Sequence, residues 1–362
     1  MPNIRPEMTA IWQLRRDDDS RFDERLLPLL AAIRQQGTLR AAARKNGLSY
    51  RHAWGMLEKG AVFFGQALVR MQRGRGAWLT PLGEKLLELE QRVTARLAPL
   101  LESLSSELRH ELDATLDGGH EQPQRIYASH GLGIGQLREL AERDPHLHLD
   151  LQYRGSLDSL RALLAGQCLL AGFHVPLGDP GRRLAPRFLA LLDASEHRLI
   201  LMAAREQGLI TAADNPLGLH EVADLGWAGV RFINRQPESG SRLLFDLLRE
   251  QAGLASTDID GYDNAEFTHL AVAALISAGV ADCGFGIHAA AARFGLGFVP
   301  LALERYFLAV RAADLDSEPV RALRGVMQGE EFRQRLEALP GYDPAGAGEV
   351  WPVARLDPDR QV

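Results

Sequence analysis

Residues 37–80 read GTLRAAARKNGLSYRHAWGMLEKGAVFFGQALVRMQRGRGAWLT, and this stretch decides the fold of the N-terminal part of the chain. Asn46-Gly47 is a turn signal between two helical patterns, and Ser49 can cap the second of them. The pattern predicts a helix over about 38–45, a tight turn and a second helix over about 49–60. This is the layout of a helix-turn-helix, in which the second helix is free to enter a DNA major groove.

A basic hairpin is expected after the second helix, with Arg73-Gly74-Arg75-Gly76 as its tip. On the helix we expect Tyr50, Ala53, Trp54 and Leu57 to form the inner face, with Trp54 in the core. Arg51 and His52 would then face base edges, and the remaining cations would hold phosphates. The residues expected to contact DNA are Arg40, Arg44, Lys45, Ser49, Tyr50, Arg51, His52, Arg73 and Arg75.

The charge of the chain is unevenly distributed. Between Gly37 and Gly76 there are eight Lys and Arg residues and a single acid, Glu58, a local balance of +7. Residues 1–36 carry six basic and six acidic side chains, so the remainder must carry −13 to give the formal net charge of −6. An acidic body with one basic module indicates a DNA contact confined to that module.

The segments on either side of this module are predicted to be helical. Residues 26–33 form an amphipathic first helix, and Ile11-Trp12-Leu14 reads as an edge strand. Thr80-Pro81 starts a long helix, which Pro99 should kink or split. Its apolar stripe predicts a homodimer through residues 81–116, and a tetramer stays open. The stripe consists of Leu82, Leu86, Leu89, Val93, Leu97, Leu100, Leu104 and Leu108.

After about residue 120 the periodicity changes to short apolar runs that alternate with helical segments, which is typical of an α/β domain. We expect four domains or segments. They are a winged helix-turn-helix over 1–80, a linker and dimerisation helix over 81–120, a two-lobed ligand-binding domain over 121–339 with its second lobe at about 197–290, and an irregular tail over 340–362. Strands are expected at 125–129, 147–153, 168–173, 188–192, 198–202, 296–300 and 306–310, among others.

Three turns in this domain end a strand and open a helix, and such helix N-termini bind anions. They are Ser129-His130-Gly131, Gly155-Ser156 and Asn234–Arg242. The third combines two arginines, two serines and a glycine. His174 follows a strand and can face the same cleft, and Thr268-His269 open another helix. The residues expected to bind a ligand are Ser129, His130, Gly155, Ser156, His174, Arg235, Ser239, Gly240, Ser241, Arg242 and Thr268.

Several classes of function lack support in the sequence. The two cysteines, Cys168 and Cys283, lie in apolar runs and read as reduced buried thiols. A nucleophile elbow, a P-loop and a zinc pattern are missing, so we expect no enzyme, no catalytic residues and no metal site. No apolar run reaches about 18 residues and no secretory signal is present, so we expect a cytoplasmic protein that does not contact membranes.

Two known families resemble this chain. Residues 22–110 resemble the winged-helix domain of molybdate-responsive (ModE-type) and LysR-type regulators, and residues 124–335 resemble the type II periplasmic-binding-protein-like domain fused to such headpieces. The N-terminal resemblance rests on Leu39-x-x-Ala42-Ala43, Gly47-Leu48-Ser49-Tyr50-Arg51-x-Ala53-Trp54, the Arg73–Gly76 tip and Leu79-Thr80-x-x-Gly83. The C-terminal one rests on Gly155-Ser156, Leu163–Gly166, Ala171–His174, Asn234–Gln236, Ser239–Arg242, Thr268-His269 and Ala281–Gly286.

The resemblance implies an α+β multidomain regulator that binds a double-stranded DNA operator and senses a small anionic effector between two lobes. Relatives of the binding domain are associated with molybdate, tungstate or molybdenum-cofactor metabolism, so the resemblance favours molybdate or tungstate as effector and no other cofactor. ModE-type proteins hold molybdate in small β-barrels, and nothing after residue 120 resembles those. A small organic acid or a ligand related to the molybdenum cofactor therefore stays open as the alternative.

Overall fold

The computed structural model describes residues 6, 8–72, 74–116, 124–144, 147, 149–237 and 239–356, and it separates the chain into two compact units. Residues 9–97 form the first, which we call the head unit, and residues 98–362 together with 1–8 form the second, the body unit. Within the part of the chain that the structure describes, no helix combines the length and the apolar character needed to cross a bilayer.

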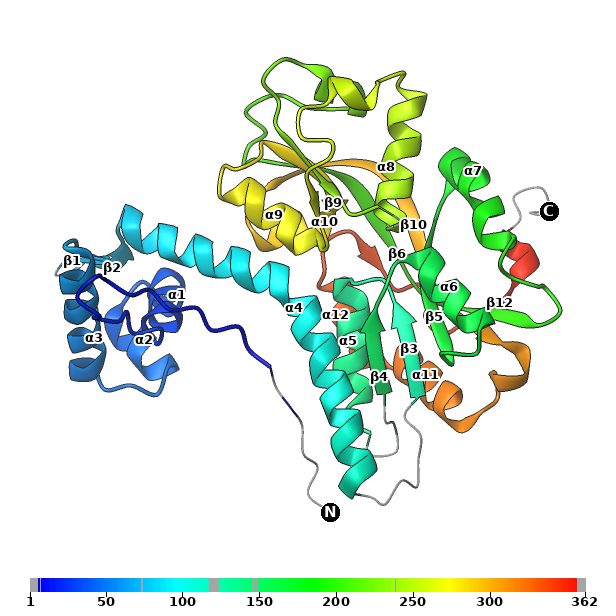
Figure 1. The fold of residues 1–362 in the computed structure, drawn as a ribbon, viewed down its shortest axis with the longest axis horizontal. Helices are drawn as coiled ribbons and strands as arrows, with labels where there is room; N and C mark the ends of the chain where they lie inside the picture. Colours follow the sequence, from blue (N-terminus) through cyan, green and yellow to red (C-terminus); the bar gives the residue numbers. More distant parts are fainter. Residues whose placement is uncertain are drawn as a thin grey trace. The chain divides into compact units, whose positions relative to one another are not determined.

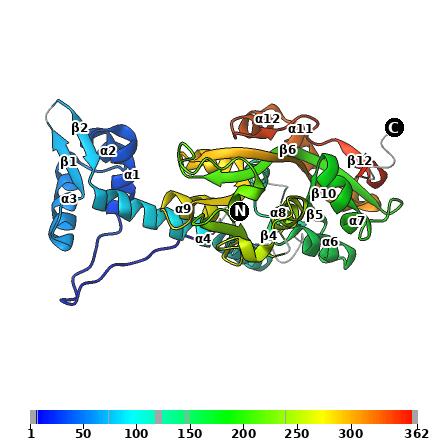
Figure 2. The same ribbon diagram turned by 90° about the horizontal axis from the view of Figure 1, so that it is seen from above.

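The head unit consists of three helices followed by a two-stranded hairpin (Figures 1 and 2). Helices α2 (Leu39–Lys45) and α3 (Tyr50–Phe64) follow α1 (Leu26–Gln36), and strands β1 (Val69–Gln72) and β2 (Gly76–Leu79) are antiparallel. Ser49 caps α3, because its Oγ accepts a hydrogen bond of 3.1 Å from the His52 backbone N–H. The predicted helices, turn and hairpin are confirmed, whereas Ile11-Trp12-Leu14 is not a strand.

The apolar residues of the three helices pack into one small core. Leu26, Leu30 and Ile33 of α1 are fully buried, and α3 contributes Ala53, Met56, Leu57 and Gly60. A Cβ added to Gly60 would lie 2.8 Å from Leu26 Cδ1, so α1 and α3 are closely packed at this glycine.

The prediction that Tyr50 and Trp54 belong to the inner face of α3 is wrong. Tyr50 is 50% and Trp54 40% exposed. The buried residues 53, 56, 57 and 60 lie along one side of the helix. Because successive residues are rotated by about 100° around the helix axis, residue 54 lies next to this buried side and not within it.

Helix α4 (Pro81–Leu116) contains Pro99 and is not split by it. Thr80 caps its start, where Thr80 Oγ1 accepts a hydrogen bond of 3.2 Å from the Gly83 N–H. Within the body unit, Ser106 Oγ donates a hydrogen bond to Asp150 (3.0 Å), and Tyr153 donates one to Glu102 (2.7 Å). The later part of α4 is thus hydrogen-bonded to β4 (Leu149–Tyr153) of the body unit.

The body unit is organised by one mixed sheet with the order β4-β3-β5-β10-β6-β9-β7-β8, and β11 and β12 pair with β6. Two strands of 15 residues, β6 and β10, run antiparallel to each other at its centre, with Arg205 opposite Glu304. The strands are β3 (Gln124–Ala128), β4 (Leu149–Tyr153), β5 (Leu170–Pro176), β6 (His197–Thr211), β7 (Phe232–Arg235), β8 (Ala265–Glu266), β9 (Cys283–Ile287), β10 (Gly297–Arg311), β11 (Tyr342–Asp343) and β12 (Val350–Pro352).

The long strands β6 and β10 connect two lobes (Figure 1). Lobe I contains β3, β4 and β5, and lobe II contains β7, β8 and β9. The helices of lobe I are α5 (Leu132–Ala141), α6 (Ser156–Leu164), α7 (Gly178–Leu189), α11 (Glu318–Gln328) and α12 (Glu330–Glu337). Those of lobe II are α8 (Gly240–Gln251), α9 (His269–Ser277) and α10 (His288–Arg293), and short 3-10 helices are η1 (Val222–Gly226), η2 (Ser256–Asp258), η3 (Ala312–Asp314) and η4 (Val353–Leu356).

Three predictions for this unit need correction. Residues 188–192 are not a strand, because α7 extends to Leu189. The strands expected at 296–300 and 306–310 are the two ends of β10. The tail is not wholly irregular, since β11 and β12 add to β6 and Trp351 is 4% exposed. Residues 357–362 of the tail and 117–120 of the expected linker lie outside the described residues.

Candidate functional site

The head unit presents exposed cations on α2, α3 and the hairpin. Arg40, Arg44, Arg51 and Arg75 are exposed, and within the described residues none of them pairs with a carboxylate. Lys45 Nζ donates a hydrogen bond of 2.6 Å to Gln35 Oε1. Ser49 and His52 are also exposed, whereas Arg73 lies outside the described residues.

Two aromatic rings lie beside these cations. Tyr50 and Trp54 stack with ring centroids 6.3 Å apart, and Trp54 Nε1 donates a hydrogen bond of 2.7 Å to Glu58. The exposed face of α3 therefore combines aromatic surface with the positive charge of Arg51.

In the body unit, the N-termini of three helices come together between the lobes. Ser156 is the first residue of α6, and its Oγ lies 3.0 Å from Ser129 Oγ in the loop before α5. A Cβ added to Gly240, the first residue of α8, would lie 3.3 Å from the same Ser156 Oγ. Ser241 Oγ lies 3.4 Å from Nε2 of His269, which opens α9. Converging helix N-termini favour negative charge.

A buried ion pair lies beside these residues, and together they form the cluster that we call the cleft, after the ligand site expected there. Arg205 Nε donates a hydrogen bond of 2.5 Å to Glu304 Oε1, and both side chains are almost fully buried. Gln207 Nε2 donates to Glu304 Oε1 (2.9 Å) and to Ser241 Oγ (2.7 Å), so it joins the ion pair to α8. Burial opposes the charge of Arg205, but Glu304 outweighs it and raises the pKa of Arg205 above its usual range.

Arg235, at the end of β7, is the second buried cation of the cleft. Its Nη2 donates a hydrogen bond of 2.8 Å to the Phe267 carbonyl, whereas its buried Nη1 has no partner within the described residues. Burial lowers the pKa of Arg235 to about 9, and the like charge of Arg205 acts in the same direction. A bound anion would supply both the missing acceptor and the missing countercharge.

Three histidines surround the same cluster. His174 stacks on Tyr306 with centroids 4.1 Å apart, and its Nε2 lies 3.9 Å from Glu304 Oε1. Nε2 of His174 and Nδ1 of His269 are buried without a hydrogen-bond partner within the described residues. Burial, followed by the positive charge of nearby arginines, lowers the pKa of His174 and His269. The same two causes lower the pKa of His130 to about 3. The three rings are therefore neutral at pH 7.

The structure brings together most of the residues expected at the ligand site, but not all of them. Ser129, Ser156, His174, Arg235, Gly240 and Ser241 meet in the cleft, and Gly155 is the N-cap of α6. Ser239 and Thr268 cap α8 and α9 with their hydroxyl groups. His130 packs edge-to-face on Tyr153, 4.8 Å between centroids. Arg242 instead bonds Asp246 (3.0 Å) and lies over Tyr262.

The cleft also contains residues that were not expected from the sequence: Arg205, Gln207, Glu304 and Tyr306, with His269 only a weaker candidate. A signal was present in the chain. Arg205 and Gln207 interrupt the apolar run of residues 199–211, and Glu304 interrupts that of 301–310. A charge inside a strand that is otherwise apolar indicates a buried partner of opposite sign.

Known proteins resemble parts of this chain. The YvgK protein of Bacillus subtilis is 31% identical over 199 residues, which cover 55% of this chain and 64% of that protein. The molybdenum-pterin-binding protein MopB of Rhodobacter capsulatus is 35% identical over 103 residues, 27% of this chain and 38% of MopB. The chain thus spans less than two thirds of the length of either relative.

Among solved structures, OxyR of Corynebacterium glutamicum in its peroxide-bound form matches with a TM-score of 0.44 and 16% identity, over 86% of this chain and 94% of that one. A likeness of that size carries no functional conclusion. The model of the PBP superfamily domain matches residues 137–328, more than half of the chain and most of both lobes. The chain therefore belongs to the PBP superfamily.

Proposed function

We propose that the protein is a ligand-responsive transcriptional regulator that binds operator DNA with its head unit and a small oxyanion, molybdate or tungstate, in the cleft of its body unit. The observation that carries the ligand part is Arg235. It is a buried guanidinium with one unsatisfied Nη1, held beside three helix N-termini. With its neutral histidines, the cluster of Arg205, Arg235 and Glu304 carries one net positive charge, which favours an anion.

The choice of molybdate or tungstate is supported by one relative. One relative, MopB, is named as a molybdenum-pterin-binding protein, and the similarity covers 38% of it. The test is calorimetry of the full chain with molybdate, tungstate, sulfate and phosphate. Binding of molybdate or tungstate in the micromolar range is expected. Absence of heat from either metal oxyanion at millimolar concentration overturns this part of the proposal.

One observation favours an organic ligand instead. Gln207 Oε1 and Glu304 Oε2 are buried acceptors without donors within the described residues. A bare dianion cannot satisfy them, whereas an organic acid or a pterin-like ligand with N–H or O–H groups can. Adding hydroxylated carboxylates and pterins to the calorimetric panel separates the two candidates, because these ligands bring donors as well as acceptors, whereas molybdate and tungstate at neutral pH bring acceptors only.

The DNA-binding part of the proposal rests on α2, α3 and the hairpin, which have the order and lengths of a winged helix-turn-helix. Arg51 on α3 would contact base edges, and Arg40, Arg44 and Arg75 would contact phosphates. Duplexes selected by the protein from a random library provide an operator for titration. Arg51→Ala should then lower the affinity for the selected sequence about 10- to 100-fold, and unchanged affinity would show that α3 is not the reading helix.

A homodimer through α4 completes the proposal. Its side chains Leu100, Leu104 and Leu108 are 57%, 37% and 38% exposed, although they repeat every four residues on one side of the helix. Sedimentation analysis should give a dimer, and Leu104→Glu should shift it to monomer. A dimer that survives this substitution would show that α4 is not the interface.

A further inference from the structure

The exposed face of α3 carries large apolar side chains that the packing of the head unit does not use. Tyr50 and Trp54 are 50% and 40% exposed, whereas Ala53, Met56 and Leu57 of the same helix are buried. Tyr50 and Trp54 lie four residues apart and therefore share one side of the helix. Apolar side chains that gather on an exposed face indicate a surface that contacts a partner.

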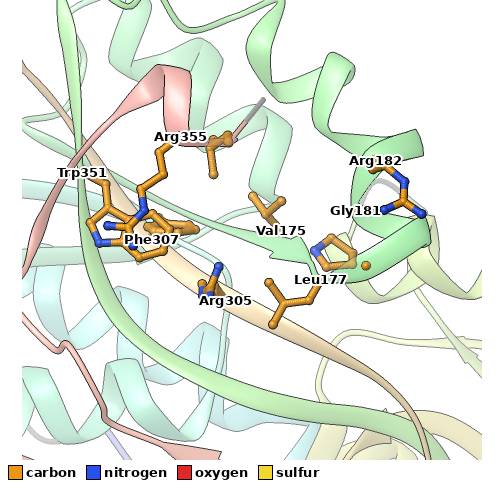
Figure 3. Close-up of a pocket in the computed structure, with 11 residues that line it drawn as sticks. Val175, Leu177, Gly181, Arg182, Arg305, Phe307, Trp351 and Arg355 are labelled. Atoms are coloured by element: carbon orange, nitrogen blue, oxygen red, sulfur yellow. The ribbon is translucent and has the colours of Figure 1, made fainter. Parts of the chain in front are cut away.

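The ring of Trp54 is held in one position by its own helix. It stacks on Tyr50 with centroids 6.3 Å apart, and its Nε1 donates a hydrogen bond of 2.7 Å to Glu58. The body unit offers a contrast in Trp351, which is 4% exposed and packs on Phe307 with centroids 5.3 Å apart (Figure 3). The ring of Trp351 fills a core, whereas the ring of Trp54 is fixed and still open to solvent.

Gly55, the next residue, leaves a gap in the same surface. A Cβ added to Gly55 would meet no atom of the described residues within 4 Å, so packing inside the chain does not require a glycine there. At Gly60 of the same helix, by contrast, the added Cβ would lie 2.8 Å from Leu26 Cδ1. Glycine is less favourable than alanine in the interior of a helix. The missing side chain at Gly55 therefore indicates that another molecule comes close to the helix at this point.

The charge around these positions favours DNA as that molecule. Arg51 lies three residues before Trp54 and four before Gly55, so the three are neighbours on the helix surface. Arg51 is exposed, and no carboxylate of the described residues pairs with it. Glu58 is the only acid between residues 37 and 76, where eight Lys and Arg residues lie. The aromatic ring thus belongs to a positively charged surface, which fits the groove of a polyanion.

The Trp54 ring can offer a base only an apolar contact. The single hydrogen-bond donor of a tryptophan side chain is Nε1, and Glu58 already accepts from it. In a duplex the faces of the bases are stacked on one another, so a side chain in the major groove meets the edges of the bases. Among the four bases, thymine presents a methyl group at that edge.

We propose that α3 recognises a thymine through its 5-methyl group, which packs on the Trp54 ring beside the base that Arg51 contacts. Gly55 gives the base edge room to reach the ring, because no side chain stands between the helix backbone and the groove. This recognition rests on the DNA-binding role proposed for the head unit, and it adds a preferred base to that role.

Deoxyuridine provides the test, because it differs from thymidine only by the missing methyl group. The full chain selects duplexes from a random library, and each thymine of the selected site is then replaced in turn. At one such position the replacement should lower the affinity of the wild type about fourfold, the value of one buried methyl group. At that position Trp54→Ala should bind the two duplexes with affinities within about 1.5-fold of each other, because the ring that contacts the methyl group is gone.

Matched variants separate this contact from a general loss of apolar surface. Val62→Ala removes a side chain that is 76% exposed in the last turn of α3, and it should keep the fourfold difference. Gly55→Ala should lower the affinity for the selected duplex about tenfold, because its methyl group obstructs the approach. Hydrogen exchange of the α3 amides should be no faster in Gly55→Ala, since alanine favours the helix. Gly325→Ala adds a methyl group at an equally open position of α11 and should leave DNA binding unchanged.

Failure of thymine recognition and failure of the DNA-binding role give different results. If the wild type selects no duplex, or if Arg51→Ala binds the selected duplex as well as the wild type does, α3 is not the reading helix and both are overturned. Thymine recognition alone is overturned if Arg51→Ala weakens binding but no uracil replacement does. The same holds if the methyl dependence persists in Trp54→Ala, if it disappears in Val62→Ala, or if Gly55→Ala binds DNA like Gly325→Ala.

Discussion

The head unit and the cleft of the body unit both depend on arginines, in opposite environments. Arg40, Arg44 and Arg51 are exposed and have no carboxylate partner within the described residues. Arg205 and Arg235 are 3% and 4% exposed, and each is held by hydrogen bonds. An exposed charge acts over a distance and is screened by salt, whereas a buried charge acts through contacts that water cannot replace. The first arrangement suits a polyanion of variable sequence, the second a single ligand of fixed shape.

The largest expected effect is on stability and lies in the cleft. Glu304→Ala leaves Arg205 buried without its countercharge, which should lower the free energy of unfolding by about 3–5 kcal/mol. Glu304→Gln keeps an acceptor for Arg205 and Gln207 and should cost less. In the head unit, Glu58→Ala removes an exposed partner of Trp54 and should cost no more than about 0.5 kcal/mol. Urea unfolding measures the free energy of unfolding of all three variants. Equal losses in Glu304→Ala and Glu58→Ala would show that the buried carboxylate of the cleft contributes no more to stability than the exposed one of the head unit.

The next effect is on ligand binding. Arg235→Gln should lower the affinity for the cleft ligand about 10- to 100-fold, because a charged hydrogen bond contributes about 1.5–3 kcal/mol. Arg242→Gln is the matched control, since Arg242 lies seven residues after Arg235. Its guanidinium is bonded to Asp246, four residues further along α8. It should change the affinity less than twofold. A larger loss at Arg242 than at Arg235 would show that the ligand lies outside the cluster.

A third effect is a pH dependence that comes from the cleft histidines. The pKa of His130 is about 3 in the folded chain, against about 6.5 when unfolded. Between these two pH values the unfolded chain binds one proton more than the folded chain. The contribution of His130 to the free energy of unfolding is therefore fully present above pH 6.5 and is lost as the pH is lowered. His130 should contribute a loss of about 2 kcal/mol between pH 7 and pH 5.

Unfolding measured across this range should show a shallower slope for His130→Gln. The exposed His220→Gln serves as control. A slope that is the same in both variants would mean that His130 is not held neutral by the fold.

The smallest effect is expected at the hairpin of the head unit. Arg75→Gln should weaken DNA binding by less than tenfold for every sequence and reduce the dependence of log K on log salt by about one unit. Titrations of a selected and an unrelated duplex at several salt concentrations measure both quantities. A loss confined to the selected duplex would show that Arg75 reads bases and does not act by charge alone.

Local patterns were sufficient for the order of elements in the head unit and for part of the cleft. Asn46-Gly47 and Ser49 place the turn and the cap, because turn and capping preferences act within four residues. Ser156, Gly240 and Ser241 could likewise be expected at helix N-termini from the strand-turn-helix pattern. Trp54 could not be placed, because the periodicity of α3 allows a large aromatic ring on either edge of its apolar stripe.

The sequence by itself determined which residues could carry charge and hydroxyl groups to helix N-termini, since those positions depend on near neighbours. Only the tertiary structure decided which of them meet. Arg205 and Glu304 are 99 residues apart and become partners through the antiparallel register of β6 and β10. Arg242 is an arginine of the same turn and helix, but its guanidinium bonds Asp246 on its own helix. Trp351, in a segment rich in proline and glycine, becomes buried because β6 offers a free edge to β12. Pairing across the sheet depends on long-range packing, which no local pattern encodes.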